Sequence, residues 1–154
     1  MKIIETVSVC DDITLISISN FSSDIAHISK VFNMISEAGI NVDMISQLPP
    51  SGANSAFSFT VSDDDFICVL AICSELRKQN PDIKISVSSG NSKVSVFGAP
   101  MREAAGVAAK VFTAAANAQA DVRMITTSET DISLLVVKTD AENVVNAIEN
   151  AFND

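Results

Sequence analysis

The chain has 154 residues, 47% of them hydrophobic, and 19 acidic against 10 basic side chains give it a formal net charge of −9. That charge argues against nucleic acid and anionic membranes as partners, because both bind proteins through clustered Lys and Arg. The sequence has no apolar run near the ~18 residues that a membrane span needs, and Glu5 interrupts the apolar N-terminus, so neither a membrane segment nor a signal peptide is expected.

The first third of the chain predicts two strands followed by a helix. Residues 3–9 (IIETVSV) and 13–19 (ITLISIS) are short β-rich runs. Residues 25–38 follow with helical spacing, and Gly39 is a suitable helix stop. The residues expected on the buried face of this helix are Ile25, Ile28, Phe32 and Ile35.

The next elements complete a first repeat. Residues 41–47 and 56–61 are predicted strands, separated by a turn at 49–52 that contains two prolines and a glycine. A helix is expected over 63–78, with the three aspartates 63–65 at its start, where carboxylates suit the helix dipole. Residues 83–88 alternate as a strand. The inward residues expected on the helix are Phe66, Val69, Leu70 and Cys73.

The second half repeats this order. FNMISEAGINVDMISQ (32–47) and FTAAANAQADVRMITT (112–127) share Phe, Val and Met-Ile at matched positions. Residues 93–98 and 131–137 are predicted strands. Thr139 to Glu142 fits a capping box for a last helix. The apolar stripe expected on that helix is Val144, Val145, Ile148 and Phe152.

Counting strands predicts how the two repeats combine. Each repeat has the α+β, ferredoxin-like order βαββαβ, but the second lacks its fourth strand, while residues 3–9 are a strand that the first does not need. We therefore expect the N-terminal strand 3–9 to complete the second sheet, which otherwise keeps an unpaired edge. The expected domains are 11–90, and 91–154 together with 2–9.

The three cysteines predict a reduced, cytoplasmic protein. Cys10, Cys68 and Cys73 are odd in number and lack CxxC spacing. We expect Cys68 and Cys73 to be buried thiols within the second helix rather than metal or redox groups. The sequence shows no metal-ligand cluster, no phosphate-binding glycine loop and no nucleophile–base pair, so no cofactor and no enzymatic activity are predicted.

Five motifs in order resemble one family. INVDMISQ (40–47), SFTV (58–61), MREAAGVAAKVF (101–112), MITTSE (124–129) and DIS (131–133) are together similar to the regulatory region of aspartate kinases. The resemblance covers residues 3–153. It implies two ACT domains, with an N-terminal strand donated to the second, and a homodimer formed through these domains.

The resemblance also implies a function and partners. It implies binding of a free amino acid, lysine or threonine in type, whose effect is passed to a kinase domain. Because the chain starts with Met and holds no kinase sequence, it resembles a separate regulatory subunit or a stand-alone descendant, with a separate kinase chain as a possible partner. The alternative is a dimerisation scaffold that has lost effector binding.

The family's effector lies between the loop after one domain's first strand and the second strand of its partner domain. Carried over, the main site comprises Met101, Gly106, Val107, Ala108, Asn41, Val42, Asp43, Ser128 and Glu129. The pseudo-equivalent site comprises Ser23, Asp24, Ala26, Gln47, Asp121 and Val122. Helix-start N–H groups suit the ligand carboxylate, and carbonyls and acidic or amide side chains suit its ammonium.

The second site departs from the family pattern. Ser23 to Ala26 stands where a DRPG-like run is expected, and Gln119 replaces a helix-ending glycine. That site is therefore expected to be closed, altered or structural.

Several candidate residues have plainer interpretations that the sequence leaves open. Met44 and Met124 fit core positions, Asp43 and Gln47 fit polar surface positions, and Arg102 and Glu129 fit ion pairs. The single histidine, His27, fits a helix surface better than a catalytic base.

Overall fold

A computed structural model of the chain describes residues 2–153. Their contacts divide them into two compact units. The α1/α2 unit contains residues 12–89, and the α3/α4 unit contains the described residues up to Asp11 together with those from Gly90 onward.

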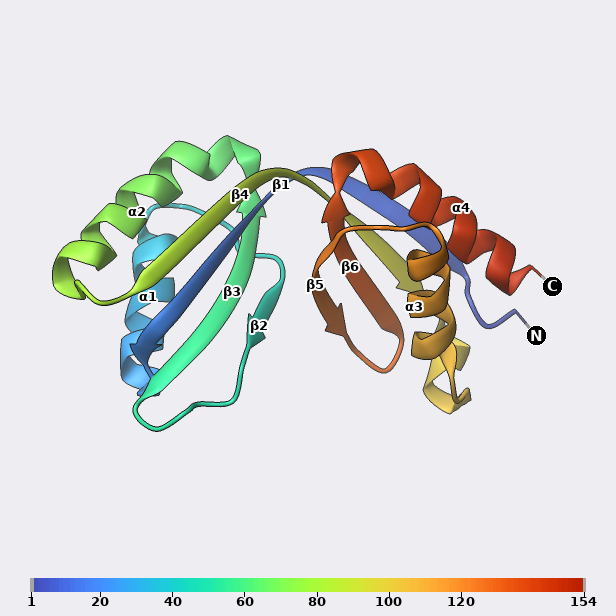
Figure 1. Ribbon diagram of the computed structural model, residues 1–154, viewed down its shortest axis with the longest axis horizontal. Coiled ribbons are helices and arrows are strands. Elements are labelled where there is room, and N and C mark those ends of the chain that lie inside the picture. Colours follow the sequence, from blue (N-terminus) through green and yellow to red (C-terminus); the bar gives the residue numbers. More distant parts are fainter. Residues whose placement is uncertain (1, 154) are drawn as a thin grey trace. The chain divides into compact units, whose positions relative to one another are not determined.

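The α1/α2 unit is an antiparallel sheet with two helices on one face (Figure 1). Its strands have the order β2-β3-β1-β4, and β3 pairs antiparallel with both β1 and β2. The elements are β1 (Thr6–Ser22), α1 (Ile25–Glu37), β2 (Ile45–Gln47), β3 (Asn54–Ser62), α2 (Phe66–Gln79) and β4 (Lys84–Phe97). The order βαββαβ predicted for this repeat is present, although β2 is shorter than the predicted 41–47.

The core of this unit corrects part of the predicted helix faces. Helix α1 buries Ile28, Val31 and Ile35, whereas Ile25, in the first turn, is 73% exposed. Helix α2 buries Val69, Cys73 and Leu76. Burial of one such aliphatic side chain contributes about 1.5–3 kcal/mol.

Two predictions for α2 are wrong. Leu70 is 39% exposed, and Cys68 is exposed while Cys73 is buried. The buried stripe runs through positions 69, 73 and 76, and Cys68 precedes it by one residue, about 100° around the helix. Cys68 therefore does not pack in the core.

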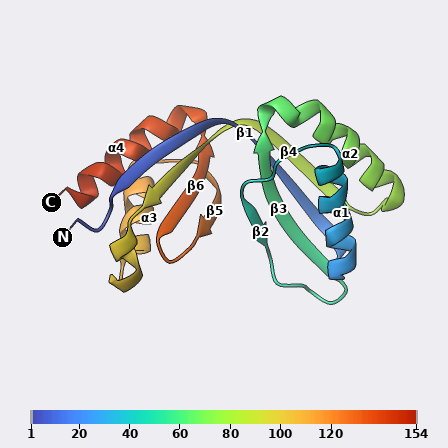
Figure 2. The same ribbon diagram turned by 180° about the vertical axis from the view of Figure 1, so that it is seen from behind.

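The α3/α4 unit has the same kind of sheet, in the order β5-β6-β4-β1. Its further elements are α3 (Val107–Asn117), β5 (Val122–Thr127), β6 (Asp131–Val137) and α4 (Ala141–Phe152). The two helices cover one face of this sheet, as Figure 2 shows from the other side. A separate core contains Val94, Val111, Leu134, Val144 and Ile148, each fully buried.

The long strands β1 and β4 correct the predicted strand boundaries. Residues 3–9 and 13–19 are not two strands, because β1 runs without a break from Thr6 to Ser22. Likewise 83–88 and 93–98 both belong to β4. Where contacts divide the units, Asp12 and Gly90 have φ values of 60° and 71°, so a left-handed residue lies in each strand at that point.

The ends of α1 and α3 repeat one C-terminal motif. After α1, Gly39 has φ 75° and Ile40 donates to the Ile35 carbonyl at 3.2 Å. After α3, Gln119 has φ 55° and Ala120 donates to the Ala115 carbonyl at 3.2 Å. Gln119 thus occupies the left-handed position that glycine occupies in the first repeat.

Other helix starts differ from the predictions. The capping box at Thr139 does not form: Asp140 is the N-cap of α4, without a side-chain hydrogen bond to that helix. The aspartates 63–65 form a 3-10 turn that Ser62 caps. Within residues 2–153, no helix has the length and apolar character to cross a membrane, and no three His, Cys, Asp or Glu side chains are placed to hold a metal ion.

Candidate functional site

The loop between β4 and α3 forms one side of the predicted main site. It begins at Gly98, whose N–H donates to Thr130 at 3.0 Å, and continues as a 3-10 turn over Ala99–Glu103. Met101 is the buried residue of that turn, at 8% exposure, and its N–H donates to the Gly98 carbonyl at 3.0 Å. The loop is therefore anchored in the core of its own unit through Met101.

Gly106 starts α3 in a conformation that suits an anion. It is the N-cap residue, with φ 84°, and no side chain caps the helix there. Val107 is buried and Ala108 half-buried. A helix start without a side-chain cap presents N–H groups and the positive end of the helix dipole, which suit a carboxylate.

An ion pair joins this loop to the β5–β6 turn. Arg102 Nε lies 3.0 Å from Glu129 Oε2, and both side chains are well exposed. Ser128 donates its N–H to the Asp131 carbonyl at 2.8 Å. Solvent keeps this exposed ion pair weak. The structure nevertheless brings the loop residues Met101 and Arg102 near Ser128 and Glu129 of the β5–β6 turn, within one unit.

The remaining main-site residues belong to the α1/α2 unit. Asn41, Val42 and Asp43 lie between α1 and β2, with Asn41 and Asp43 exposed. The Asp43 N–H donates to Thr60 at 3.0 Å, so this segment continues the β3 pairing as extended chain. Met44 and Met124, at 4% and 7% exposure, are buried, as their core interpretation predicts.

The corresponding helix start at α1 is already capped. Asp24 Oδ1 accepts the Ala26 N–H at 2.9 Å. Ser22 Oγ accepts the Asp24 N–H at 3.2 Å and lies 2.7 Å from His27 Nδ1. Ser23 donates to the Ala53 carbonyl at 2.8 Å. The Asp24 carboxylate therefore already accepts a hydrogen bond from the Ala26 N–H, a group that a ligand carboxylate would need.

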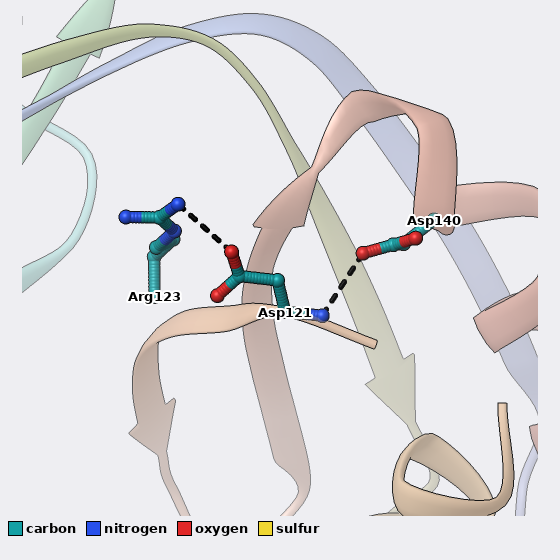
Figure 3. A network of polar contacts seen from close by, with 3 residues as sticks. All are labelled: Asp121, Arg123 and Asp140. Carbon is teal, nitrogen blue, oxygen red and sulfur yellow. Dashed lines mark hydrogen bonds and ion pairs between the residues drawn. The ribbon is translucent and has the colours of Figure 1, made fainter. Parts of the chain in front are cut away.

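The other residues of the second predicted site are distributed over both units. Gln47 ends the exposed strand β2. Asp121 Oδ2 forms an ion pair with Arg123 Nη2 at 2.8 Å, and the Asp121 N–H donates to Asp140 Oδ2 at 2.9 Å (Figure 3). Val122, at the start of β5, is half-buried.

Some of these contacts were not predicted from the sequence. Arg123 lies two residues from Asp121 and so on the same side of an extended chain, a spacing that could have predicted their ion pair. His27 was expected only on a helix surface, where it does lie, but its contact with Ser22 depends on the turn before α1. Asp140 bonds across 19 residues, which no local pattern indicates.

Comparisons with known proteins agree with this architecture. A model of the ACT domain family matches residues 94–152. Aspartokinase 2 of Bacillus subtilis is 29% identical over 150 residues, which are 97% of this chain and 36% of that protein. The chain thus spans about a third of the length of such relatives and corresponds to a part without the catalytic domain.

Solved structures extend the likeness over the whole chain. The ligand-free regulatory subunit of aspartate kinase from Thermus thermophilus is 29% identical, with a TM-score of 0.87, 98% of this chain covered and 99% of that one. A structure of aspartokinase alpha and beta subunits is 30% identical, with a TM-score of 0.86 and the same coverage. The chain belongs to the ACT-domain regulatory regions of aspartate kinases.

Proposed function

We propose that the chain is an allosteric regulatory module that binds a free amino acid, lysine or threonine in type, and passes the effect to a separate kinase chain. Both units are then ACT domains, with boundaries close to 12–89 and to 90–154 plus the N-terminal segment. We also propose homodimerisation through these domains, as the resemblance to the family implies.

The uncapped start of α3 supports binding at the Gly106 loop. A free amino acid needs donors for its carboxylate and acceptors for its ammonium. The N–H groups at Gly106–Ala108 are the donors. Glu129 and Asp43 carry the acceptor groups of the proposed site, with Asn41, Val42, Met101 and Ser128 as its further lining. The contrast with α1, where Asp24 makes the same bond internally, favours one effector site over two.

A matched pair of substitutions tests this site. Gly106→Asp places a carboxylate on the N-cap residue of α3, the position that Asp24 has on α1, and Asp tolerates the left-handed conformation. We expect it to abolish amino-acid binding, while Gly106→Asn, of equal size but neutral, weakens binding less. Amide NMR shifts on adding lysine or threonine report the binding. Equal binding by both variants and the wild type contradicts the assignment.

A ligand-free scaffold is the second candidate, and the capping of α1 favours it. If neither helix start can bind a ligand, no amino acid shifts the amide NMR signals of the wild type, and Asp24→Ala does not restore binding. Under the main proposal, the wild type responds at 98–108 and 128–129, and Asp24→Ala leaves that response unchanged.

A further inference from the structure

The α3/α4 unit ends its sheet in a free strand edge. In the order β5-β6-β4-β1, the first part of β1, Thr6–Asp11, has β4 on one side. Strand β3 pairs with β1 only from Ile13 onward. Among residues 2–153, no other strand pairs with Thr6–Asp11.

The alternation of hydrogen bonds shows which groups this edge presents. The Glu5 N–H donates to the Phe97 carbonyl at 2.8 Å, and Ser92 Oγ donates to Asp11 Oδ1 at 2.6 Å, so the segment runs antiparallel to β4. Backbone groups of successive residues in such a pair point alternately toward and away from the partner. The side of Thr6–Asp11 opposite β4 therefore presents the backbone N–H and C=O groups of every second residue.

A cavity of about 270 Å³ lies beside the start of this edge, between it and the end of α4. Ile4 and Ile148, at 4% and 0% exposure, form its base, and the half-buried Val7 and Phe152 line its sides. Figures 1 and 2 both show α4 beside the first part of β1. A strand edge next to a helix with an apolar pocket between them is the arrangement that accepts an extended peptide as an added strand.

The charges around this edge are mainly acidic. Glu5 and Glu149 line the cavity together with one basic residue, Lys2. Asp11 and Asp12 are exposed at the far end of the segment, while the middle, Thr6–Cys10, carries no charge. An apolar centre between acidic ends complements a segment whose apolar residues alternate with Lys or Arg.

We propose that Thr6–Asp11 and the cavity beside α4 bind an extended basic segment of a partner protein by β-strand addition. The segment's backbone pairs with the side of Thr6–Asp11 that faces away from β4, one aliphatic side chain enters the cavity lined by Ile4 and Ile148, and its cations lie near Glu5 and Glu149. None of the residues that line this cavity belongs to the proposed amino-acid site at Gly106.

A second copy of the chain fits this edge poorly. Two copies that pair antiparallel about Ser8 place Glu5 of each opposite Asp11 of the other. Like charges directly opposite one another destabilise a strand pair. The acidic ends thus disfavour self-association and leave the edge to a basic partner.

The test uses a labelled probe peptide of sequence KVKIKVK with the full chain. We expect saturable binding by fluorescence anisotropy, with amide NMR shifts confined to residues 4–11 and 148–153. The peptide EVEIEVE, with the same apolar residues and opposite charge, should not bind. A KVKIKVK peptide N-methylated at alternate amides should also fail, because it cannot pair as a strand.

Variants of the chain separate the backbone and charge contributions. Ser8→Pro removes a backbone N–H from the middle of this edge and interrupts its regular pairing, so it should abolish binding, whereas Ser8→Thr keeps it. Glu5→Lys with Glu149→Lys should weaken binding about 2- to 30-fold, as two surface ion pairs imply. Glu37→Lys, an exposed change on the other unit, should have no effect.

Several outcomes overturn the proposal. They are equal binding of the acidic and basic peptides, shifts outside the two named segments, and unchanged binding by a Ser8→Pro chain whose thermal unfolding is native. Concentration-dependent self-association that Ser8→Pro abolishes also overturns it, because a second copy then occupies the edge.

Discussion

Single residues decide how far the two repeats are alike. Gly39 and Gln119 occupy the same position after α1 and α3, and both are left-handed, but only glycine adopts that conformation without a Cβ penalty. Asp24 and Gly106 occupy the two helix starts, one with a side-chain bond and one without. The repeats therefore share the backbone conformation after the helix, whereas the helix starts differ, with Asp24 extended at φ −69° and Gly106 left-handed at φ 84°.

Gln119→Gly should stabilise the chain. It relieves a left-handed φ of 55°, which costs a non-glycine residue about 1–2 kcal/mol, partly offset by the greater entropy of glycine when unfolded. We expect the free energy of unfolding to rise by about 0.5–1 kcal/mol in urea titrations. Gly39→Gln is the reciprocal control and should lower it; stabilisation by both changes contradicts this account.

Cys73 should behave unlike the other two thiols. Burial raises its pKa above the ordinary value of 9.0, and the Arg77 charge opposes this in part. A thiol-specific reagent at pH 8 should label the exposed Cys10 and Cys68 quickly and Cys73 only after unfolding. Fast labelling of all three in the native chain contradicts the burial of Cys73.

The same shift gives a pH dependence of stability. Because the folded-state pKa of Cys73 lies above the unfolded one, the unfolded chain loses this proton first. The Cys73 contribution is complete below about pH 9 and declines as the pH rises through the folded pKa. Urea titrations from pH 8 to 10.5 should show a smaller decline for Cys73→Val than for the wild type.

At the scale of elements, helices and strands were predictable wherever periodicity was local. The spacing of apolar residues predicts the strand 131–137 (β6), the buried stripe through Val144 and Ile148, and the start of α1. The strand boundaries in β1 and β4 were not predictable, since nothing local shows that 3–9 continues into 13–19. The exposure of Ile25, Cys68 and Leu70 depends on where each helix lies over its sheet, which spacing alone does not determine.

The junction between Gly98 and the N-terminal segment gives the prediction at this scale. A Cβ on Gly98 meets the Ile3 carbonyl oxygen at 2.0 Å, and its extended φ of −168° is one that any residue adopts, so the obstacle is steric alone. Gly98→Ala should therefore displace residues 3–5, destabilise the α3/α4 unit by about 1–3 kcal/mol and speed amide exchange in β1.

The control for Gly98→Ala is Ala99→Ser at the exposed neighbouring position. Its exchange and its unfolding in urea should match the wild type. If amide exchange at residues 5–11 is as slow in the Gly98→Ala variant as in the wild type, this close approach does not hold the segment in place.

At the scale of the whole molecule, the sequence predicted two repeats of one order, and the family likeness covers the chain. The helix start at Gly106 and Ala108 was predictable, because it lies on a recognisable motif, whereas ligand binding there stays a prediction. The bond between Asp140 and Asp121 was not predictable, because it joins distant segments, whereas ion pairing was one interpretation of both Arg102 and Glu129. These contacts depend on how helices and turns meet across a sheet.

The central claim is that the uncapped start of α3 binds a free amino acid. Isothermal titration calorimetry of the chain with each of the twenty amino acids tests it most directly. We predict saturable heat with lysine or threonine, lost in Gly106→Asp and retained in Asp24→Ala. No heat with any amino acid, or heat that Gly106→Asp leaves unchanged while Asp24→Ala removes it, contradicts the account.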